Sequence, residues 1–433
     1  MVVSPALHGI RAEILSVPHD PRDAGKEAAI YHADGLLVIE DGLVVARGDY
    51  AAIASRFPGL AIADHRGRLL VPGFIDTHIH YPQTDRIAAH GLQLLDWLET
   101  HIFPAERAFA DRAHADAVAA FFLDELLRQG TTTALVYATV HPASVDALFE
   151  TALARGMRIV SGKVLMDLGP EGLRDTPARA RADSEALLAR WRGRGRLGYA
   201  VTPRYALASS DAQLQVAGEL IAEHPDTLMH THISESPREI SAVAARFPQA
   251  RDYVDAYDRF GLVGPRSVFA HGVHLDTSEC ARLARAGSAL ALCPTSNLFL
   301  GSGLFDLARL DTHKLKLGLG TDVGAGTSFS MLATMAEAYK VCQLRGASLD
   351  PFRALYLATA GGAIALGLAD RIGALSVGQE ADFVLLDPAG TPLAARRCAG
   401  EGLAERLFAL QVLGDDRHIH STWLMGRQVC TPA

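Results

Sequence analysis

From about residue 70 to residue 365, the sequence repeats one pattern: a short strand-like run, a polar loop, and a segment of helical period ending near Gly or Pro. Eight strand segments are expected, at residues 73–80, 131–139, 157–165, 197–204, 227–234, 267–273, 288–295 and 316–323. Eight strands alternating with helices predict an α/β fold, a (β/α)8 TIM-like barrel, although doubly wound sheets alternate in the same way.

The helical segments between these strands carry recognisable start and stop signals. In residues 144–156, Ser144 is expected to be the N-cap and Gly156 the C-terminal glycine of a helix. Residues 209–224 show an apolar face of the same kind, and residues 276–287 again end in Gly. These signals support the alternating reading of the central chain.

The two ends of the chain have a different, strand-rich character. Residues 35–47 predict a hairpin that turns at Glu40-Asp41-Gly42, and residues 381–386 and 421–430 also read as strands. Residues 389–402 are expected to be a surface loop. We therefore expect residues 1–70 and 371–433 to form a small β-sandwich domain, and residues 71–370 to form the barrel.

Composition excludes several classes of protein. The chain has 433 residues, 49% of them hydrophobic and 21% charged, and a formal charge of 41 − 49 = −8. The sequence has no run of Lys and Arg of the kind that binds a nucleic acid polymer. No apolar run approaches the length needed to span a membrane. Five scattered cysteines without a CxxC pair suit a reducing compartment and indicate no thiolate zinc site. The N-terminus lacks the apolar region of a signal peptide, so a cytoplasmic protein is expected.

Residues of metal-ligand type gather at the C-terminal ends of four predicted strands. The first strand ends in His78 and His80, which the period of two places on one side; the others carry His232, His271 and Asp322. Each alone has an ordinary explanation, such as a hydrogen-bonded core histidine or a turn residue. Together, at the functional end of one barrel, they predict a site for zinc or a similar divalent ion.

Such a site predicts hydrolysis. A bound metal lowers the pKa of water toward neutrality, so that metal-bound hydroxide can attack an electrophilic carbon. The leaving group must also receive a proton, and Glu235 follows the metal-binding strand at a suitable position. Asp322 is expected both to bind the metal and to accept a proton from the attacking water.

Several motifs together resemble the amidohydrolase superfamily and, more narrowly, the guanine deaminase family. They are PGFIDTHIHYPQ (72–83), DWLETHIFPAE (96–106), TPRYAL (202–207), HTHISE (230–235), FAHGVHL (269–275), CPTSNLFLGSGLF (293–305) and GTDVGAGTSFSM (320–331). The resemblance covers nearly the whole chain. It implies a homodimeric enzyme of purine catabolism with one zinc per chain, which hydrolyses guanine at C2 to xanthine and ammonia.

The resemblance also implies a role for each site residue. The metal ligands would be His78, His80, His232, His271 and Asp322, with Glu235 and Asp322 as the catalytic proton carriers. Guanine would be bound by Gln83, Arg204 and Glu235, between pocket walls formed by Trp97, Leu98 and Tyr205. Tyr205 stands where the family pattern has Phe, and Ser236 where Asn is usual, so the fine polarity of the pocket is expected to differ.

Within the superfamily, the sequence favours a mononuclear site. Binuclear members place a modified lysine at the end of the fourth strand, whereas this strand ends in Arg204. Lys163 lies on the third predicted strand and is expected to be structural or to support the ligands. The HxE and PCxxC motifs of the other zinc deaminase class are absent from the sequence.

His230 and His232 lie on the same face of their predicted strand, so the two-residue period of the strand does not decide which of them binds the metal. The other ligands already crowd a zinc ion that must keep a water, so only one of this pair is expected to bind metal. His232 lies nearer the strand end and matches the ligand of the family. His230 should lie about 6–7 Å deeper and belong to the core or support the ligands.

Two other functions stay open at the level of sequence. One is an aminohydrolase of the same fold that acts on another purine, a pterin or a triazine. The other is a catalytically silent scaffold, although such a chain would be expected to lose ligands.

Overall fold

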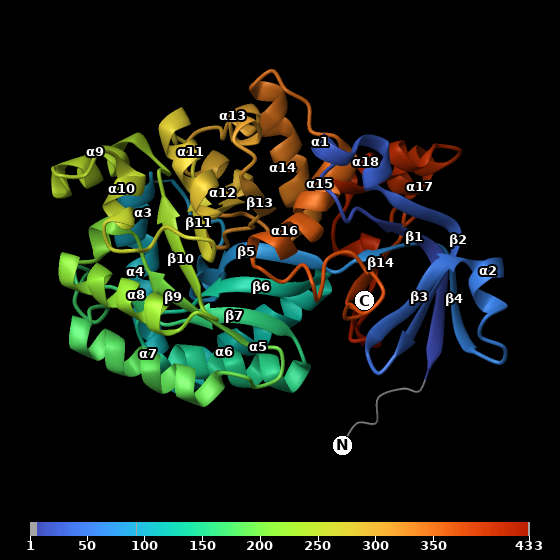
Figure 1. The fold of residues 1–433 in the computed structure, drawn as a ribbon, viewed down its shortest axis with the longest axis horizontal. Helices are drawn as coiled ribbons and strands as arrows, with labels where there is room; N and C mark the ends of the chain where they lie inside the picture. Colours follow the sequence, from blue (N-terminus) through green and yellow to red (C-terminus); the bar gives the residue numbers. More distant parts are fainter. Residues whose placement is uncertain (1–6, 92, 432–433) are drawn as a thin grey trace.

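The computed structural model describes residues 7–91 and 93–431, which form two β-sheets and their covering helices (Figure 1). One sheet has the strand order β13-β12-β11-β10-β9-β7-β6-β5, and all its pairs are parallel. Its strands are β5 (Phe74–His80), β6 (Thr131–Tyr137), β7 (Arg158–Gly162), β8 (Val164–Leu165), β9 (Gly198–Pro203), β10 (Leu228–Ile233), β11 (Ser267–His271), β12 (Ala289–Leu292) and β13 (Lys316–Leu319).

This sheet is a nearly closed barrel of eight strands, because β7 and β8 both pair with β9 as two parts of one strand. The first and last strands meet through side-chain and backbone hydrogen bonds. Thr77 Oγ1 donates to the Leu319 carbonyl (2.9 Å), and Asp322 N donates to the His78 carbonyl (2.9 Å). The predicted barrel and its eight strands are therefore confirmed.

The helices of the central chain surround this barrel, and several of the loops that connect them to the strands contain short helical turns (Figure 1). The helices are α3 (Leu94–Trp97), α4 (Phe103–Arg107), α5 (Arg112–Arg128), α6 (Pro142–Arg155), α7 (Pro177–Trp191), α8 (Asp211–Glu223), α9 (Pro237–Arg246), α10 (Tyr253–Asp258), α11 (Thr277–Ala286), α12 (Pro294–Phe299), α13 (Leu307–Thr312), α14 (Met331–Leu344), α15 (Pro351–Leu357) and α16 (Ala360–Ala365). The short turns are the 3-10 helices η2 (Tyr81–Arg86), η4 (Ala108–Ala110) and η5 (Ala206–Ala208) and the π-helix η3 (Leu98–Ile102).

One predicted helix start is wrong. Ser144 is not an N-cap, because α6 begins two residues earlier at Pro142, a residue suited to the first helical position. The Ser144 hydroxyl instead donates to the His141 carbonyl (2.7 Å) and accepts from Thr139 N (3.1 Å). The predicted end is confirmed, since Gly156 adopts the left-handed conformation (φ 69°) of a C-terminal glycine.

An apolar plug closes the N-terminal end of the barrel. Side chains from the strands pack there against Ala363, Ala365 and Leu366 at and just beyond α16; they are Ile75, Leu135, Val160, Ala200, Leu228, Val268, Ala289 and Ala291. These residues are buried because a parallel sheet in this fold is covered on both faces. The histidines of β5 and β11 that were predicted as ligands lie toward the opposite, C-terminal end.

Both chain ends contribute to the second sheet, a mixed sheet with the order β16-β15-β14-β4-β1-β2-β3. Its strands are β1 (His8–Ser16), β2 (Ile30–Glu40), β3 (Leu43–Asp49), β4 (Ala61–Pro72), β14 (Phe383–Leu386), β15 (Ile419–Leu424) and β16 (Arg427–Cys430). The helices α1 (Pro21–Ala24), α2 (Tyr50–Ala54), α17 (Pro392–Cys398) and α18 (Leu403–Leu413) and the 3-10 turns η1 (Gly25–Ala28) and η6 (Asp416–His418) accompany it. The β1–β4 pair is parallel and the other pairs are antiparallel.

The chain-end predictions are met in part. The hairpin turn at Asp41 and Gly42 is confirmed, and both residues have positive φ. Residues 421–430 are not one strand but lie in the hairpin β15–β16, which turns at Met425 and Gly426. The surface loop predicted for residues 389–402 is wrong, because Thr391 caps a helix, α17, that starts with a proline.

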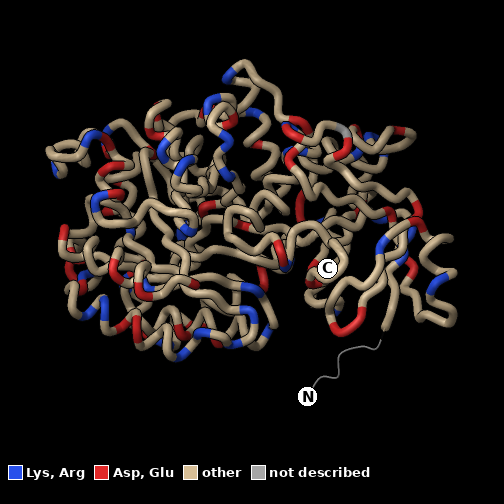
Figure 2. The backbone as a smooth tube through the Cα atoms, in the orientation of Figure 1, with Lys and Arg blue, Asp and Glu red and all other residues tan. Residues whose placement is uncertain are grey.

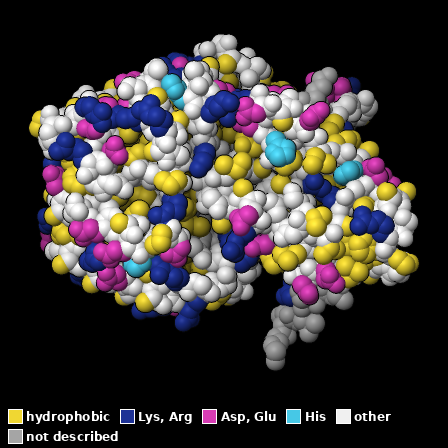
Figure 3. All heavy atoms as spheres, viewed as in Figure 1, with side chains coloured by type: hydrophobic (Ala, Val, Ile, Leu, Met, Phe, Trp, Pro, Cys, Tyr) yellow, Lys and Arg dark blue, Asp and Glu magenta, His cyan; other side chains and the backbone are white. Residues whose placement is uncertain are grey.

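Charges of both signs are interspersed along the backbone, as Figure 2 shows, and on the face drawn in Figure 3. Within the described residues, no helix combines the length and apolarity required to cross a membrane.

Candidate active site

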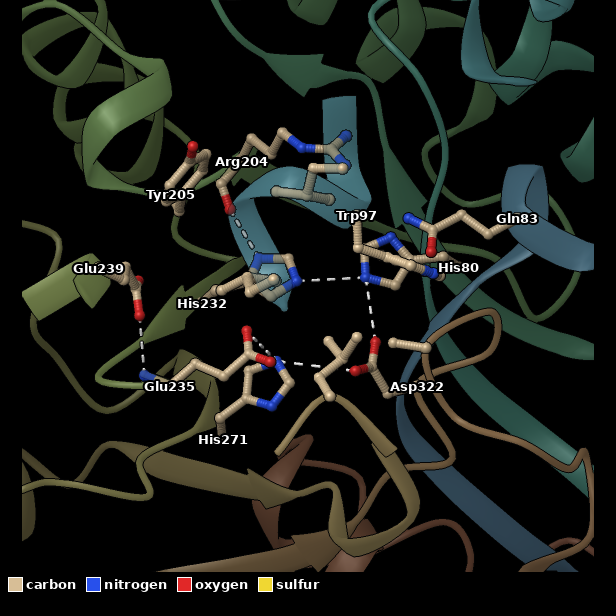
Figure 4. A pocket seen from close by; sticks show the side chains of 14 residues that line it. His80, Gln83, Trp97, Arg204, Tyr205, His232, Glu235, Glu239, His271 and Asp322 are labelled. Carbon is tan, nitrogen blue, oxygen red and sulfur yellow. Dashed lines mark hydrogen bonds and ion pairs between the residues drawn. The ribbon is translucent and has the colours of Figure 1, made fainter. Parts of the chain in front are cut away.

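Two histidines of β5 point to the same side from alternate positions of the strand, and one of them, His80, lines the cavity drawn in Figure 4. His78 and His80 are both buried, and their Nε2 atoms lie 3.2 Å apart. An extended strand repeats its facing every second residue, which is why the HxH pair converges.

The remaining donors come from three other strand ends of the barrel. His232 on β10 places Nε2 3.2 Å from His80 Nε2, and Asp322, in the turn after β13, places Oδ1 3.1 Å from His78 Nε2. His271 at the end of β11 holds Nε2 3.8 Å from Asp322 Oδ2. All five residues predicted as ligands therefore meet at one end of the barrel.

Two of these residues have unusual backbone conformations. The backbones of His271 (φ 74°) and Asp322 (φ 52°) lie in the left-handed region, which residues other than glycine seldom adopt. Residues held in this way concentrate at functional sites, where the surrounding structure offsets the strain. Each side chain is thereby turned from its strand end toward the shared centre.

The tautomers of the histidines fit a bound cation. His232 Nδ1 lies 2.7 Å from the Arg204 carbonyl, which only accepts, so this nitrogen carries the proton and Nε2 presents a lone pair. His271 Nδ1 lies 2.9 Å from Asn297 Oδ1, and His271 Nε2 has no hydrogen-bond partner among the described residues. Buried imidazole lone pairs that face one another and a carboxylate suit a divalent ion such as zinc.

Burial sets the protonation of these groups. It lowers the pKa of His80 to about 3 and the pKa of His232 well below its usual value, so both rings are neutral, as metal ligands must be. Burial raises the pKa of Glu235 well above its usual value, and the nearby Asp322 charge adds to the rise. Burial also acts to raise the pKa of Asp322, but His78 and His80 hold it well below the ordinary range.

His230 lies behind the site and does not line the cavity. It is fully buried, and its Nε2 lies 2.7 Å from Nδ1 of His78. Such a contact fixes the ring of His78 from its distal side.

One sulfur atom lies closer to the site than the cysteine spacing indicated. Cys293 Sγ forms a group with donor atoms of His78, His271 and Asp322 that lie within 4.8 Å of one another. Its thiol also contacts the Ala291 carbonyl at 3.5 Å, and burial raises its pKa well above the usual value.

A cavity opens in front of these donors (Figure 4). Every predicted substrate-binding residue lines it; the full lining is His80, Gln83, Leu94, Trp97, Leu98, Arg204, Tyr205, His232, Glu235, Glu239, His271, Leu300, Asp322 and Ala325. The indole of Trp97 is held by a hydrogen bond from Nε1 to the Ala89 carbonyl (3.1 Å).

Four polar residues at the site were not anticipated from the sequence. Glu106 contacts Gln83 and Arg204, and Asn297 contacts His271. Ser302 donates to Glu235 Oε1 (3.1 Å), and Glu239 accepts from the backbone N–H groups of Glu235 and Ser236. Only Glu239 had a local signal, the capping-box spacing Ser236-x-x-Glu239.

Lys163, expected to be structural or to support the ligands, lies between β7 and β8 and is fully buried. Its ammonium pairs with Asp175 and lies 3.3 Å from Asp183. It does not line the cavity.

The Amidohydrolase family model matches residues 69–429, and the chain belongs to this family. Within the family, the chain is 49% identical to guanine deaminase of Escherichia coli (strain K12), with 98% of this chain and 97% of that protein covered. It is 34% identical to guanine deaminase of Homo sapiens, over 83% of this chain and 82% of that protein.

A solved structure leads to the same assignment. Guanine deaminase from Bradyrhizobium japonicum superimposes with a TM-score of 0.96 at 40% identity, covering 99% of this chain and 100% of that one. The predicted class, a hydrolase of the amidohydrolase fold that resembles guanine deaminases, is therefore confirmed.

Proposed function

We propose that this chain hydrolyses guanine to xanthine and ammonia, with one zinc ion bound by His78, His80, His232, His271 and Asp322. The observation that carries the proposal is the meeting of these five donors at one end of the barrel, beside a cavity that is also lined by Arg204, Gln83 and Trp97. The similarity to proteins named guanine deaminase over nearly the full chain supports the choice of substrate.

A divalent ion bound by these five side chains would lower the pKa of a water molecule toward neutrality and polarise the reacting carbon. The protein supplies the rest. Trp97 stacks on the purine, while Arg204 and Gln83 donate hydrogen bonds to its acceptor edge. These contacts place C2 against the donor cluster and exclude bulk water from it.

Proton transfer is assigned to two carboxyl groups. Asp322 accepts a proton from the attacking water as oxygen bonds to C2. Glu235, whose pKa is raised by burial, donates a proton to the ring nitrogen and then takes up the proton of the new hydroxyl group, while the proton held by Asp322 passes to the departing amino group. The carbon–nitrogen bond breaks, ammonia leaves, and the oxygen of water remains on C2 as the carbonyl of xanthine.

The decisive experiment measures metal content and guanine conversion on one sample of the protein. We expect about one zinc per chain and release of ammonia and xanthine in equal amounts. A metal-loaded sample that leaves guanine unchanged but releases ammonia from another purine, a pterin or a triazine would contradict the proposal. We also propose a cytoplasmic homodimer, which fractionation and light scattering would test.

A further inference from the structure

Glu106 on α4 is a buried carboxylate behind the wall of the cavity, and it joins two residues that face the substrate. Its Oε1 accepts from Nε2 of Gln83 at 3.2 Å, and its Oε2 accepts from Nη1 of Arg204 at 2.6 Å. The side chains of Arg204 and Glu106 are only 3% and 1% exposed. Glu106 itself does not line the cavity, so it acts on a ligand through these two residues.

The amide of Gln83 has one permitted orientation in this setting. Its Oε1 accepts from Gly324 N at 3.2 Å, while Nε2 donates to the carboxylate of Glu106. Rotating the amide by half a turn would set its oxygen against a carboxylate and its NH2 against an N–H group. The second N–H of Nε2 is therefore available to donate to a ligand, while Oε1 is turned toward Gly324 N.

Arg204 is restrained in the same way. Nη1 is bound to Glu106, and the guanidinium carbon lies 5.2 Å from the centre of the Phe103 ring. The guanidinium has no acceptor, so the N–H groups that remain toward the cavity only donate. Figure 4 shows Arg204 and Gln83 on the wall of the same cavity.

We propose that Glu106 is a positioning residue that makes the ligand-reading edge of the cavity donor-only, and so selects 6-oxopurines over 6-aminopurines. A 6-oxopurine offers two adjacent acceptors, O6 and N7. A 6-aminopurine would place an NH2 donor against fixed donors, leaving buried polar groups unpaired. This inference rests on the proposed guanine reaction for the way in which the purine lies in the cavity.

The test uses the metal-loaded full chain with Glu106→Gln, which keeps the shape but removes the charge that orients both partners. We expect KM for guanine to rise about 10- to 100-fold while kcat changes only a few-fold, because lost uniform binding appears in KM. Binding of hypoxanthine and adenine is measured alongside by calorimetry. These purines both lack the 2-amino group and differ in the substituent at C6 and in the proton at N1, so their Kd ratio reports how the C6 edge is recognised.

In the wild type we expect hypoxanthine to bind at least about tenfold tighter than adenine, and Glu106→Gln to bring the two Kd values close together. Glu279→Gln removes a buried carboxylate at the start of α11, away from the cavity, and is the matched control that should retain KM and the Kd ratio. If Glu106→Gln fails to fold, Glu106→Asp keeps the charge at shorter reach and should give a smaller shift in the same direction.

An unchanged Kd ratio in a folded Glu106→Gln variant would overturn the inference, even where guanine turnover falls. Equal binding of hypoxanthine and adenine by the wild type would overturn it as well. A wild type that does not deaminate guanine, yet discriminates between the two ligands through Glu106, would contradict the proposed function and retain the role of Glu106.

Discussion

At the scale of single residues, the imidazoles of β10 show how position divides the work between similar side chains. His232 presents Nε2 to the donor cluster, while His230, two positions earlier, contacts the distal nitrogen of His78. One can therefore bind a metal directly and the other only through its neighbour.

Removing these two histidines should affect metal binding to different extents. His232→Ala deletes a ligand and should abolish stoichiometric metal binding. His230→Ala deletes a support and should weaken metal affinity only about 10- to 100-fold. Elemental analysis after dialysis against a graded chelator measures both, and equal metal loss from the two variants would count against this division.

Glu235 should be essential for turnover without being needed to bind metal. Glu235→Gln keeps the shape but cannot carry a proton, so kcat should fall by about 10²- to 10⁴-fold while metal content stays at the wild-type level. Ser302→Ala, which removes one hydrogen bond to Glu235, should cause a much smaller loss. Near-full activity of Glu235→Gln would refute its role as the proton carrier.

At the scale of elements, α9 and α11 begin with the same device and differ in what stands beside it. Each has a capping box whose glutamate is buried: Glu239 at α9 and Glu279 at α11. The carboxylate of Glu239 accepts a hydrogen bond from the backbone N–H of Glu235. The carboxylate of Glu279 accepts one from the backbone N–H of Asp276, which lies away from the cavity. The first cap therefore also positions the backbone of Glu235, the proposed proton carrier.

Replacing the two capping glutamates separates stability from activity. Glu239→Ala and Glu279→Ala should each cost about 1–3 kcal/mol, because buried backbone donors lose their acceptors. Only Glu239→Ala should also lower kcat, by about tenfold or more, since Glu235 loses the contact that holds its backbone. Thermal unfolding and steady-state kinetics measure the two effects; comparable kcat values in both variants would refute the positioning role.

At the scale of the whole molecule, a buried ionic network connects the barrel to the chain-end sheet. Arg196, which precedes β9, pairs with Asp382 (2.6 Å) and Glu380 (2.8 Å) next to β14, and Arg158 on β7 also pairs with Glu380. The division into residues 71–370 and the two chain ends stays a prediction, and this network lies across the proposed boundary.

Arg196→Leu should destabilise the protein by about 3–5 kcal/mol, because it leaves Asp382 buried without its partner. Burial raises the pKa of Asp382, and Arg196 opposes that rise, so the variant should have the higher pKa. A carboxyl group whose pKa is raised by folding takes up a proton on folding and gains stability as the pH falls. The loss of stability caused by Arg196→Leu should therefore shrink as the pH falls from the pKa of Asp382 in the variant to its pKa in the wild type. Both of these pKa values lie above the ordinary carboxyl value.

Urea unfolding across a pH series from mildly alkaline to mildly acidic measures this deficit. Arg155→Leu, which removes a more exposed pair with Asp124, is the control and should cost no more than about 1 kcal/mol at any pH. A deficit for Arg196→Leu that stays constant or grows as the pH falls would contradict the assignment to Asp382.

The sequence by itself determined the barrel, its eight strands and the five donors at its C-terminal end. Strand period and helix period are local properties, and parallel strands bring their ends together once their number is known. It also placed the Asp41-Gly42 turn and the Gly156 helix end, since both depend on conformations that a few residues adopt easily.

Only the tertiary structure decided the contacts that join distant segments. Glu106 meets Gln83 and Arg204, and Asn297 meets His271, across sequence separations that no period encodes. The predictions of an N-cap at Ser144 and of a loop in place of α17 were wrong because a serine or a proline is equally compatible with a cap, a loop or a first helical turn. The identity of the donors was a property of the sequence, whereas their orientation depends on long-range hydrogen bonds that form only when the barrel closes.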